Sequence, residues 1–380
     1  MLTPEEQLLV ICARPRLTAA LSEKLRSLMA KEIDWRIVVN GAIQNLIVPL
    51  LAHHTLTIES PRLDSDARNL LLAARDQAII RMMHIAGLRK RLIDDYLLAL
   101  NVQFVELKGD AISRALYGAS FIRQYRDIDL LVDESRLLHV AIKLESDGWK
   151  VMNKEWDPDQ GRTLDVLSKF QAAIEMRHPS GVVVELHRTL DNSGCVFNSS
   201  RLLKSARNAR AIGLLPLHEH VAYLCFHHSR HKWESLHWCG DAAAIADMTA
   251  TEMEYIRKFA RSHGFESTID ETLKLARNLA EMAETGESIS YGESRFLPDF
   301  LRSLRGSVYP EIRNNEADEN ERQPDYSYAW QRSRWYKMKF AMSRLRPTLN
   351  DHNWLPLDPG WRWMYWFTRP IRIFSRGVQR

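Results

Sequence analysis

The sequence lacks any hydrophobic run long enough to cross a lipid bilayer. Nowhere in its 380 residues does a stretch approach about 18 consecutive apolar residues, which excludes a transmembrane helix. The first residues, MLTPEEQLLVICARPRL, carry glutamates where a secretory signal needs basic side chains, and the apolar run after them is too short. These absences predict a cytoplasmic protein.

Cysteine is scarce, and the common nucleotide-binding fingerprint is missing. The chain has four cysteines without a paired spacing, so we expect no disulfide framework: Cys12, Cys195, Cys225 and Cys239. No Walker motif is present, which argues against a P-loop enzyme. With 45% hydrophobic and 26% charged residues, the composition is ordinary for a globular protein and can fill two or three modest domains.

Negative charge is almost absent from the end of the chain. Residues 331–380 contain eleven lysines and arginines against two aspartates, a formal charge of +9. Because the whole chain carries only +4, the first 330 residues are near −5. The basic character therefore belongs to the last fifty residues, which are also rich in tryptophan.

The most informative stretch is Asp127-Ile128-Asp129, followed by the apolar run 130–132. This composition predicts a buried strand, on which Asp127 and Asp129 project from the same face about 7 Å apart. Two carboxylates so placed repel each other unless a cation lies between them, and hard ions such as Mg²⁺ favour oxygen ligands. An isolated Asp-x-Asp commonly marks a strand end at a turn, so its surroundings decide between the two interpretations.

Those surroundings favour a nucleotide site. About twenty residues upstream, the apolar run 104–107 ends at Lys108-Gly109-Asp110, and a predicted helix over 111–117 follows. A strand, a glycine turn and a helix N-terminus form an anion site, because free backbone N–H groups and the helix dipole point at the ligand. An anion site beside a metal-binding carboxylate pair suits a nucleoside triphosphate.

At this point the chain resembles the polymerase-β-like nucleotidyltransferase superfamily, through the glycine turn and the pattern Arg-x-x-x-Asp-Ile-Asp-Leu-Leu-Val over 123–132. Residues 107–109 and 123–132 are most similar to a large, poorly characterised bacterial group within it. One departure is Gly109-Asp110, where the superfamily usually has Gly-Ser or Gly-Gly. The resemblance implies that Asp127 and Asp129 hold two Mg²⁺ ions, and that a third acidic residue follows on a neighbouring strand.

A β-hairpin is predicted from 170–177 and 182–187, around the turn 178–181. On its second strand Glu185 and His187 share a face. The resemblance makes Glu185 the third catalytic carboxylate and metal ligand, with Glu175 on the partner strand in reserve. Two roles stay open for His187, contact with the substrate or a hydrogen bond to Glu185.

Five residues are predicted to bind the nucleotide: Lys108, Gly109, Asp110, Arg123 and Arg126. Glycine at 109 lets the backbone approach the phosphates because it has no Cβ. Lys108 or Arg123 would neutralise phosphate charge. For Arg123 a salt bridge that orients the aspartate pair is an equal alternative, and Arg126 takes either role or faces solvent.

Beyond residue 191 the pattern is helical and rich in histidine. His227 and His231 have the i,i+4 spacing of a zinc-binding helix, but no glutamate follows His227, so packing roles are favoured. Related family members have a similar pattern of His, Trp and Asp. We therefore expect His228, His231 and Asp241, together with His187, to shape an acceptor pocket.

The predicted fold is α+β, a small mixed β-sheet nucleotidyltransferase core flanked by N-terminal and C-terminal helical regions. The predicted organisation is a helical region 1–100, the core 101–190, a helical region 191–305, a polar linker 306–330 and a basic aromatic tail 331–380. For the tail, packing back onto the globule is favoured, and peripheral membrane contact or RNA binding are the alternatives.

The predicted function is metal-dependent transfer of a nucleoside monophosphate from an NTP, such as ATP, to a hydroxyl acceptor, with release of pyrophosphate. The acceptor is a small molecule, a peptide or tRNA. Three alternatives stay open. They are a toxin-like enzyme that modifies tRNA, an enzyme acting on a sugar phosphate, peptide or antibiotic, and a catalytically silent scaffold held at the membrane by its tail.

Overall fold

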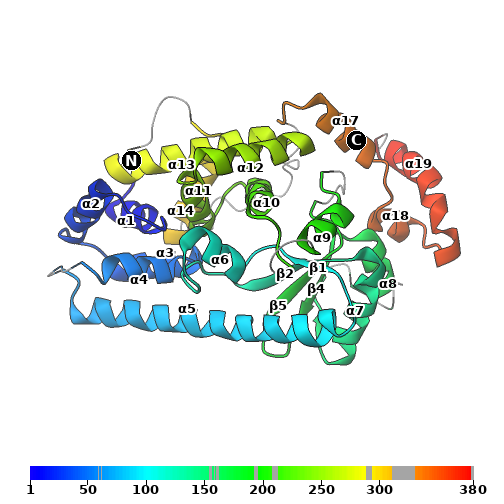
Figure 1. Ribbon diagram of the computed structural model, residues 1–380, viewed down its shortest axis with the longest axis horizontal. Coiled ribbons are helices and arrows are strands. Elements are labelled where there is room, and N and C mark those ends of the chain that lie inside the picture. The colour runs from blue at the N-terminus through cyan, green and yellow to red at the C-terminus, as the bar shows by residue number, and fades with distance from the viewer. Residues whose placement is uncertain are drawn as a thin grey trace. The chain divides into compact units, whose positions relative to one another are not determined.

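The computed structural model describes residues 1–58, 60, 62–153, 156–157, 159, 162–191, 196–207, 213–287, 293–309 and 330–377 (Figure 1). The chain forms two compact units. The first contains Met1–Ala86, Gly109–Tyr125 and Leu217–Arg332, and the second contains Gly87–Lys108, Arg126–Pro216 and Ser333–Arg380. Each unit therefore draws on segments that are far apart in the sequence, and the predicted core 101–190 contributes to both.

The first unit is built from helices. They are α1 (Pro4–Cys12), α2 (Ala19–Met29), α3 (Trp35–Gln44), α4 (Val48–Thr55), α6 (Asp110–Tyr117), α10 (Leu217–Arg230), α11 (Leu236–Ala246), α12 (Ala250–His263), α13 (Glu266–Thr285) and α14 (Leu297–Val308). Helix α5 (Ser65–Arg91) contributes to both units and continues into a π-helical turn, η1 (Leu92–Leu98). The predicted helical character of residues 1–100 is thus confirmed.

Capping residues and glycines determine many of these helix ends. Thr3 begins α1 with a capping box to Glu6, and Thr249 does the same for α12 with Glu252. Gly118 and Gly264 end α6 and α12 in the left-handed conformation. Helix α1 is buried along almost its whole length, and its apolar residues belong to the first unit's hydrophobic core.

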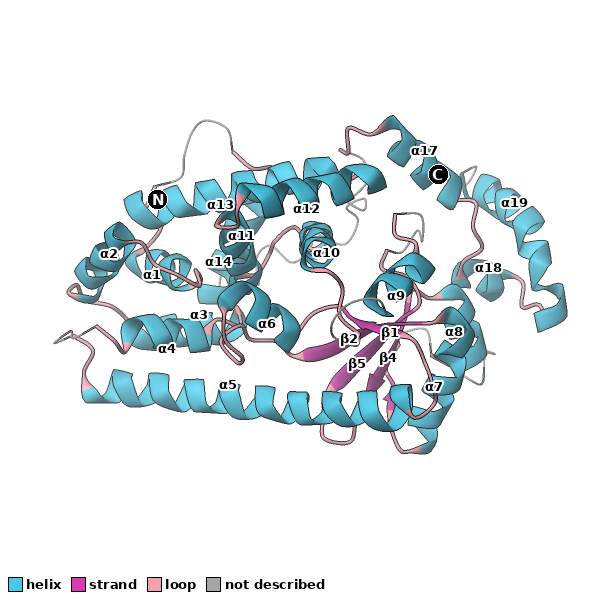
Figure 2. Cartoon of the chain, viewed as in Figure 1, coloured by secondary structure: helices cyan, strands magenta, loops and turns pink. Residues whose placement is uncertain are grey.

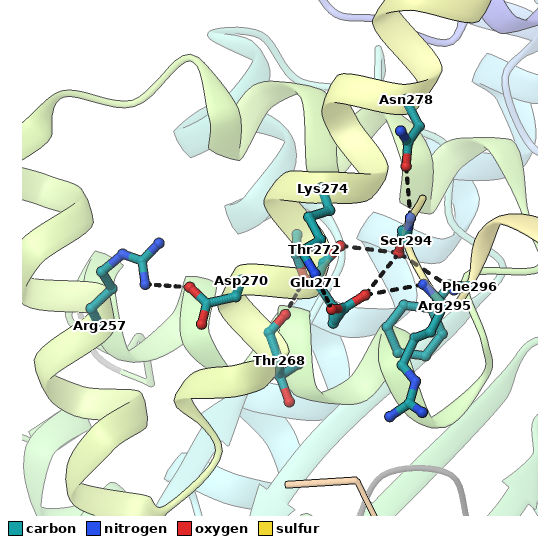
Figure 3. Close-up of polar contacts among 10 residues, drawn as sticks. All are labelled: Arg257, Thr268, Asp270, Glu271, Thr272, Lys274, Asn278, Ser294, Arg295 and Phe296. Carbon is teal, nitrogen blue, oxygen red and sulfur yellow. Dashed lines mark hydrogen bonds and ion pairs between the residues drawn. The ribbon is translucent and has the colours of Figure 1, made fainter. Parts of the chain in front are cut away.

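The approach to α14 is held by polar contacts from α13 (Figure 3). The Glu271 carboxylate accepts from the Arg295 backbone N–H at 3.0 Å and from Lys274 at 2.9 Å, while Asn278 accepts from the Ser294 N–H at 2.8 Å. The bonds from the Arg295 and Ser294 N–H groups pair two backbone donors that precede α14. Part of the predicted linker, 306–309, is described, and α14 continues to Val308 there; residues 310–329 lie outside the described residues.

The second unit holds a five-stranded mixed sheet, drawn in magenta in Figure 2. Its strands are β1 (Phe104–Glu106), β2 (Asp127–Val132), β3 (Lys150–Val151), β4 (Ala173–Arg177) and β5 (Val183–His187), in the spatial order β1-β2-β5-β4-β3. Strands β2 and β5 are parallel, and the other neighbours are antiparallel. Helices α7 (Glu134–Ser146), α8 (Leu164–Phe170) and α9 (Ser199–Arg207) accompany the sheet. The α+β prediction is confirmed.

The two faces of the central strands differ in chemistry. Ile128, Leu130, Val184 and Leu186 are buried on one face. Asp127, Asp129, Glu185 and His187 alternate with them and therefore project from the other face. The register pairs Asp129 with Glu185 and Leu131 with His187. The sheet thus gathers four ionisable side chains on one surface while its other surface forms a core.

The last part of the second unit is helical: α17 (Arg334–Ser343), α18 (Leu349–Trp354), η3 (Pro359–Met364) and α19 (Tyr365–Gly377). Helix α18 packs against α8 and α19. The prediction that the tail's aromatics pack back onto the globule is correct for Tyr336 and Tyr365, which are buried. It is wrong for six exposed side chains: Trp335, Trp354, Trp361, Trp363, Trp366 and Phe367.

No helix in the described ranges combines the length and the apolar character that crossing a membrane requires. The three cysteines in these ranges, Cys12, Cys225 and Cys239, are buried free thiols, and Cys195 lies outside them. Burial raises the pKa of the Cys225 thiol to about 12, so this thiol is protonated at neutral pH.

Candidate active site

The acidic residues predicted from the sequence converge on strands β2 and β5. Asp129 and Glu185 are direct neighbours across the parallel pair, and Asp127 lies two residues before Asp129 on the same face. Asp129, Glu185 and His187 each offer one ligand atom, and these three atoms all lie within 4.8 Å of one another. This is the one such group of metal-ligating side chains in the parts of the chain that the structure describes.

The two carboxylate oxygens of Asp129 differ in their contacts. Its side chain is fully buried, and Oδ1 contacts Lys108 Nζ at 2.9 Å and His187 Nε2 at 3.3 Å. Oδ2 is buried without a hydrogen-bond partner. Burial alone would raise the pKa of Asp129, but Lys108 and His187 together lower it to about 2. An ionised carboxylate with an unused buried oxygen is a ready ligand for a cation.

Asp127 has the opposite electrostatic balance. Burial and then the charge of Asp129 raise its pKa to about 6, with a further contribution from Glu185, while Lys108 and Arg126 oppose the shift. The two aspartates therefore differ because Lys108 and His187 contact Asp129 directly. Three neighbouring carboxylates repel one another unless a cation balances their charge. Their oxygen atoms are the type of ligand that Mg²⁺ prefers.

His187 lies between the carboxylates. Its Nε2 atom is 3.1 Å from Glu185 Oε2 and 3.3 Å from Asp129 Oδ1. Burial lowers the pKa of His187, but the hydrogen bonds to Asp129 and Glu185 outweigh burial and raise it overall. Of the two roles that the sequence left open, the contact with Glu185 is present, and the contact with Asp129 was not anticipated.

The remaining sequence candidates in the second unit lie around this group. Lys108 is mostly buried beside Asp129, whereas Arg126 is exposed and adjoins Asp127 in the chain. Glu175 is exposed on β4 directly opposite Glu185. Two cationic side chains thus flank the carboxylates, and Arg126 has the free surface that contact with a phosphate requires.

Gly109 and Asp110 belong to the first unit and form the start of α6. Gly109 has φ +85° and ψ −143°, a conformation that a residue with a Cβ does not readily adopt, which explains glycine here. Asp110 is the first helical residue and pairs with Arg114 at 3.0 Å. The predicted sequence of strand, glycine turn and helix is therefore present. The phosphate-binding role of the two residues stays a prediction.

The structure assigns Arg123 a partner that neither sequence alternative named. Its Nε and Nη2 donate to Asp241 Oδ1 and Oδ2 at 2.8 and 2.7 Å, inside the first unit. Tyr117 donates to the same carboxylate at 2.8 Å, and His228 Nε2 lies 2.9 Å from it. Arg123 and His228 lower the pKa of Asp241 against the effect of burial. This cluster joins α6, α10 and α11.

This placement corrects the predicted acceptor pocket. The side chains of His228 and Asp241 are fully buried and have no surface with which to meet an acceptor. His231 is exposed, and its ring lies 5.4 Å from that of Trp238. His228 and Asp241 instead belong to the buried cluster around Arg123. The sequence could not show this arrangement, because Arg123 and Asp241 are 118 residues apart.

The first unit also contains a pocket of about 340 Å³ with a mixed-charge lining: Ser267, Asp270, Glu271, Glu293, Arg295, Trp330 and Arg332. Several of its charges are already paired, for example Asp270 with Arg257 at 2.6 Å (Figure 3). Residues 288–292 and 310–329 adjoin the lining in sequence and lie outside the described residues.

Comparison with known proteins agrees with the chemistry of the sheet. Residues 31–281 match a protein family described as "Uncharacterised nucleotidyltransferase". The matched range contains β2, β5 and the four ionisable side chains that they present. No curated protein matches the chain.

Proposed function

The chain belongs to this nucleotidyltransferase family and is therefore a transferase of phosphorus-containing groups with a nucleoside triphosphate as substrate; from that premise we propose metal-dependent transfer of a nucleoside monophosphate, with ATP as the first donor to test. An acceptor hydroxyl oxygen bonds to the α-phosphorus, the bridging bond between the α-phosphorus and the β-phosphate oxygen breaks, and pyrophosphate leaves. The hydroxyl proton passes to solvent. The acceptor is a small molecule, a peptide or tRNA.

One observation supports this proposal most strongly. Asp129 and Glu185 face each other across β2 and β5, and the buried Oδ2 of Asp129 has no hydrogen-bond partner. Asp127, Asp129 and Glu185 are the residues that would hold the two Mg²⁺ ions. Bound there, the ions would supply positive charge for the triphosphate and lower the pKa of the acceptor hydroxyl.

The protein's own side chains have distinct roles in the proposal. His187 fixes the two carboxylates that it contacts, and it is a positioning residue because it acts through Asp129 and Glu185. Lys108 holds Oδ1 of Asp129 and leaves Oδ2 available. Arg126, exposed beside Asp127, is the side chain that we propose meets the phosphates.

Incubation of the purified protein with each of the four α-labelled NTPs and Mg²⁺, in the presence of cell lysate, tests the proposal. Asp127→Asn and Asp129→Asn should each reduce transfer of label by about 100-fold or more, since each removes a charge that would hold the ions. The matched control is Asp133→Asn, in which asparagine still caps the start of α7. This variant should transfer label from the NTP as the unaltered protein does.

Metal binding gives a readout that does not depend on finding the acceptor. Titration with Mn²⁺, followed by its paramagnetic resonance signal, should show weaker binding by Asp129→Asn, and by His187→Ala in the range of about 10–100-fold. Labelling that survives both aspartate changes would rule out the mechanism. Failure of the unaltered protein to bind metal and NTP would instead favour the catalytically silent scaffold.

A further inference from the structure

Helix α19 buries Arg369 and Arg372 and exposes apolar side chains, the reverse of an ordinary amphipathic surface helix. The side that it turns toward the protein carries Tyr365, Arg369 and Arg372, whose exposed fractions are 0%, 9% and 6%. The side that faces outward carries Trp366, Phe367 and Ile371, which are 55%, 68% and 62% exposed. A surface helix normally buries its apolar stripe and keeps arginine in water.

A buried acid holds α19 in this orientation. Asp351 on α18 is fully buried, and its two oxygens accept from Arg369 Nη1 and Arg372 Nε, both at 2.6 Å. Arg369 Nε also donates to the backbone oxygen of Arg344 at 2.6 Å. Turning the helix over to bury its apolar side would strip Asp351 of both partners, and a buried charge without a partner is strongly unfavourable.

The same segment is fixed to the unit that carries the sheet. Tyr365 donates to the Leu355 carbonyl at 2.8 Å and accepts from the Leu357 N–H at 2.9 Å, and its ring packs against Phe170 of α8. Arg362 pairs with Asp165, also on α8, at 2.6 Å. The outward apolar surface is therefore presented by an ordered scaffold.

Neighbouring aromatic residues extend this surface. The rings of Trp361 and Trp363 are 6.5 Å apart, and those of Trp363 and Phe367 are 6.0 Å apart. We call Trp361, Trp363, Trp366, Phe367 and Ile371 the aromatic face. Residues 334–346 of the same unit, in which the Arg344 backbone oxygen accepts from Arg369, carry five exposed cations: Arg334, Lys337, Lys339, Arg344 and Arg346. An apolar surface of this kind commonly marks an interaction site.

We propose that the aromatic face inserts into the headgroup region of an anionic membrane and holds the second unit at the lipid surface. Tryptophan and phenylalanine partition into the interface of a bilayer, and lysine and arginine are attracted to anionic headgroups. The exposed lysines and arginines of residues 334–346 supply the electrostatic complement. Contact of this type is peripheral and needs no membrane-spanning helix.

Two other occupants fit the surface less well. Single-stranded RNA would use the aromatic rings as stacking platforms, but Ile371, together with exposed Met338 and Met342 on α17, offers aliphatic surface on which bases do not stack. A second copy of the chain would bring two segments of charge +9 together, and they would repel. An anionic lipid surface accommodates both kinds of side chain, because its interface takes up the apolar ones and its headgroups attract the cationic ones.

Cosedimentation of the full chain with vesicles tests the proposal. Binding to phosphatidylcholine vesicles that contain about 30% phosphatidylglycerol should exceed binding to pure phosphatidylcholine, and should weaken as salt is raised. The triple variant Trp363→Ser, Phe367→Ser and Ile371→Ser should reduce the partition coefficient by about tenfold or more. Because all three side chains are exposed, its melting temperature should match that of the unaltered protein.

The matched control changes three comparably exposed apolar residues outside this segment: Ile80→Ser, Met83→Ser and Tyr255→Ser. This variant should bind vesicles as the unaltered protein does. So should Asp129→Asn, which separates membrane contact from the proposed catalysis. Equal vesicle binding by the two triple variants overturns the proposal. It is also overturned by RNA binding without vesicle binding, or by a dimer that the aromatic-face variant dissociates.

Discussion

Asp127 and Asp129 project from the same face of β2, yet their ionisation differs. Lys108 and His187 contact Asp129 and keep the pKa of its carboxyl low, at about 2. Burial beside Asp129 raises the pKa of Asp127 to about 6, and Lys108 and Arg126 oppose this shift only through their charge. At neutral pH the site therefore carries a destabilising negative charge on Asp127, which a bound cation would offset.

We predict that Asp127→Asn stabilises the metal-free protein at pH 8 by roughly 1–3 kcal/mol. Folded Asp127 keeps its proton to about pH 6, whereas an unfolded aspartate loses it near 3.8. The stability from this proton is therefore fully present below about pH 4 and is lost as the pH rises through 6. Urea denaturation at pH 8 should show the gain, and at pH 4.5 the gain should shrink.

Asp133→Asn is the control for this prediction, because Asp133 lies just beyond β2 as a helix cap and asparagine caps equally well. It should leave the unfolding free energy nearly unchanged at both pH values. An equal gain for Asp127→Asn at pH 8 and pH 4.5 would show that the effect does not come from ionisation of this carboxyl.

At the residue scale, the sequence predicted what depends on local periodicity. Asp127 and Asp129 share a face because a strand alternates every two residues, and the same rule pairs Glu185 with His187 on β5. The contact between Lys108 and Asp129 depends instead on where β1 ends beside β2. No local pattern contains that information, so the role of Lys108 as the partner of Asp129 was not predicted.

At the scale of elements, the buried cluster around Asp241 joins three helices of the first unit. Tyr117 on α6, His228 on α10 and Arg123 after α6 all contact this carboxylate on α11. Arg123, which precedes the aspartate pair by a few residues, was expected either at the phosphates or in a salt bridge that orients that pair. Proximity in sequence was misleading here, because a fully buried guanidinium needs a buried anion, and that anion came from a distant helix.

Asp241→Asn is expected to destabilise the protein by about 3–5 kcal/mol, because it removes the buried carboxylate charge that pairs with the Arg123 guanidinium. Combining it with Arg123→Met should recover part of the loss, since the buried guanidinium charge is then gone as well. Thermal and urea unfolding measure both effects. The exposed Asp247→Asn, at the end of the same helix, should change little. A double variant less stable than Asp241→Asn alone would contradict the ion-pair explanation.

Helix boundaries were predictable where caps are local, and helix orientation was not. The predicted helix over 111–117 ends at Gly118 in the structure, and Thr3 and Gly264 lie at ends of α1 and α12, where capping satisfies backbone groups within a few residues. For α19, the sequence shows apolar and basic residues but does not show which side faces the protein. Asp351 decides that, by drawing Arg369 and Arg372 inward. The tail was therefore predicted to pack in the opposite sense.

At the scale of the whole molecule, the predicted core 101–190 is not one compact body. Its residues 109–125 belong to the first unit, whereas the second unit also takes in residues 87–100, 191–216 and 333–380. Hydrophobic patterning marks out consecutive regions of a chain and carries no signal that the chain crosses between two units. The sheet itself was predictable because its strands and turns follow one another closely along the chain.

We therefore predict that a fragment of residues 101–190 does not fold. It lacks the Gly213 carbonyl that accepts from the Glu106 N–H at 2.7 Å, and it lacks Arg89, which pairs with the Glu106 carboxylate. It also exposes Phe170, which packs against Tyr365 in the full chain. Amide signals of the fragment should show the narrow dispersion of a disordered chain, whereas the full chain should be well dispersed. A fragment that is well dispersed and binds Mn²⁺ would show that the carboxylate site forms without the distant segments, and would restore the contiguous core that the sequence predicted.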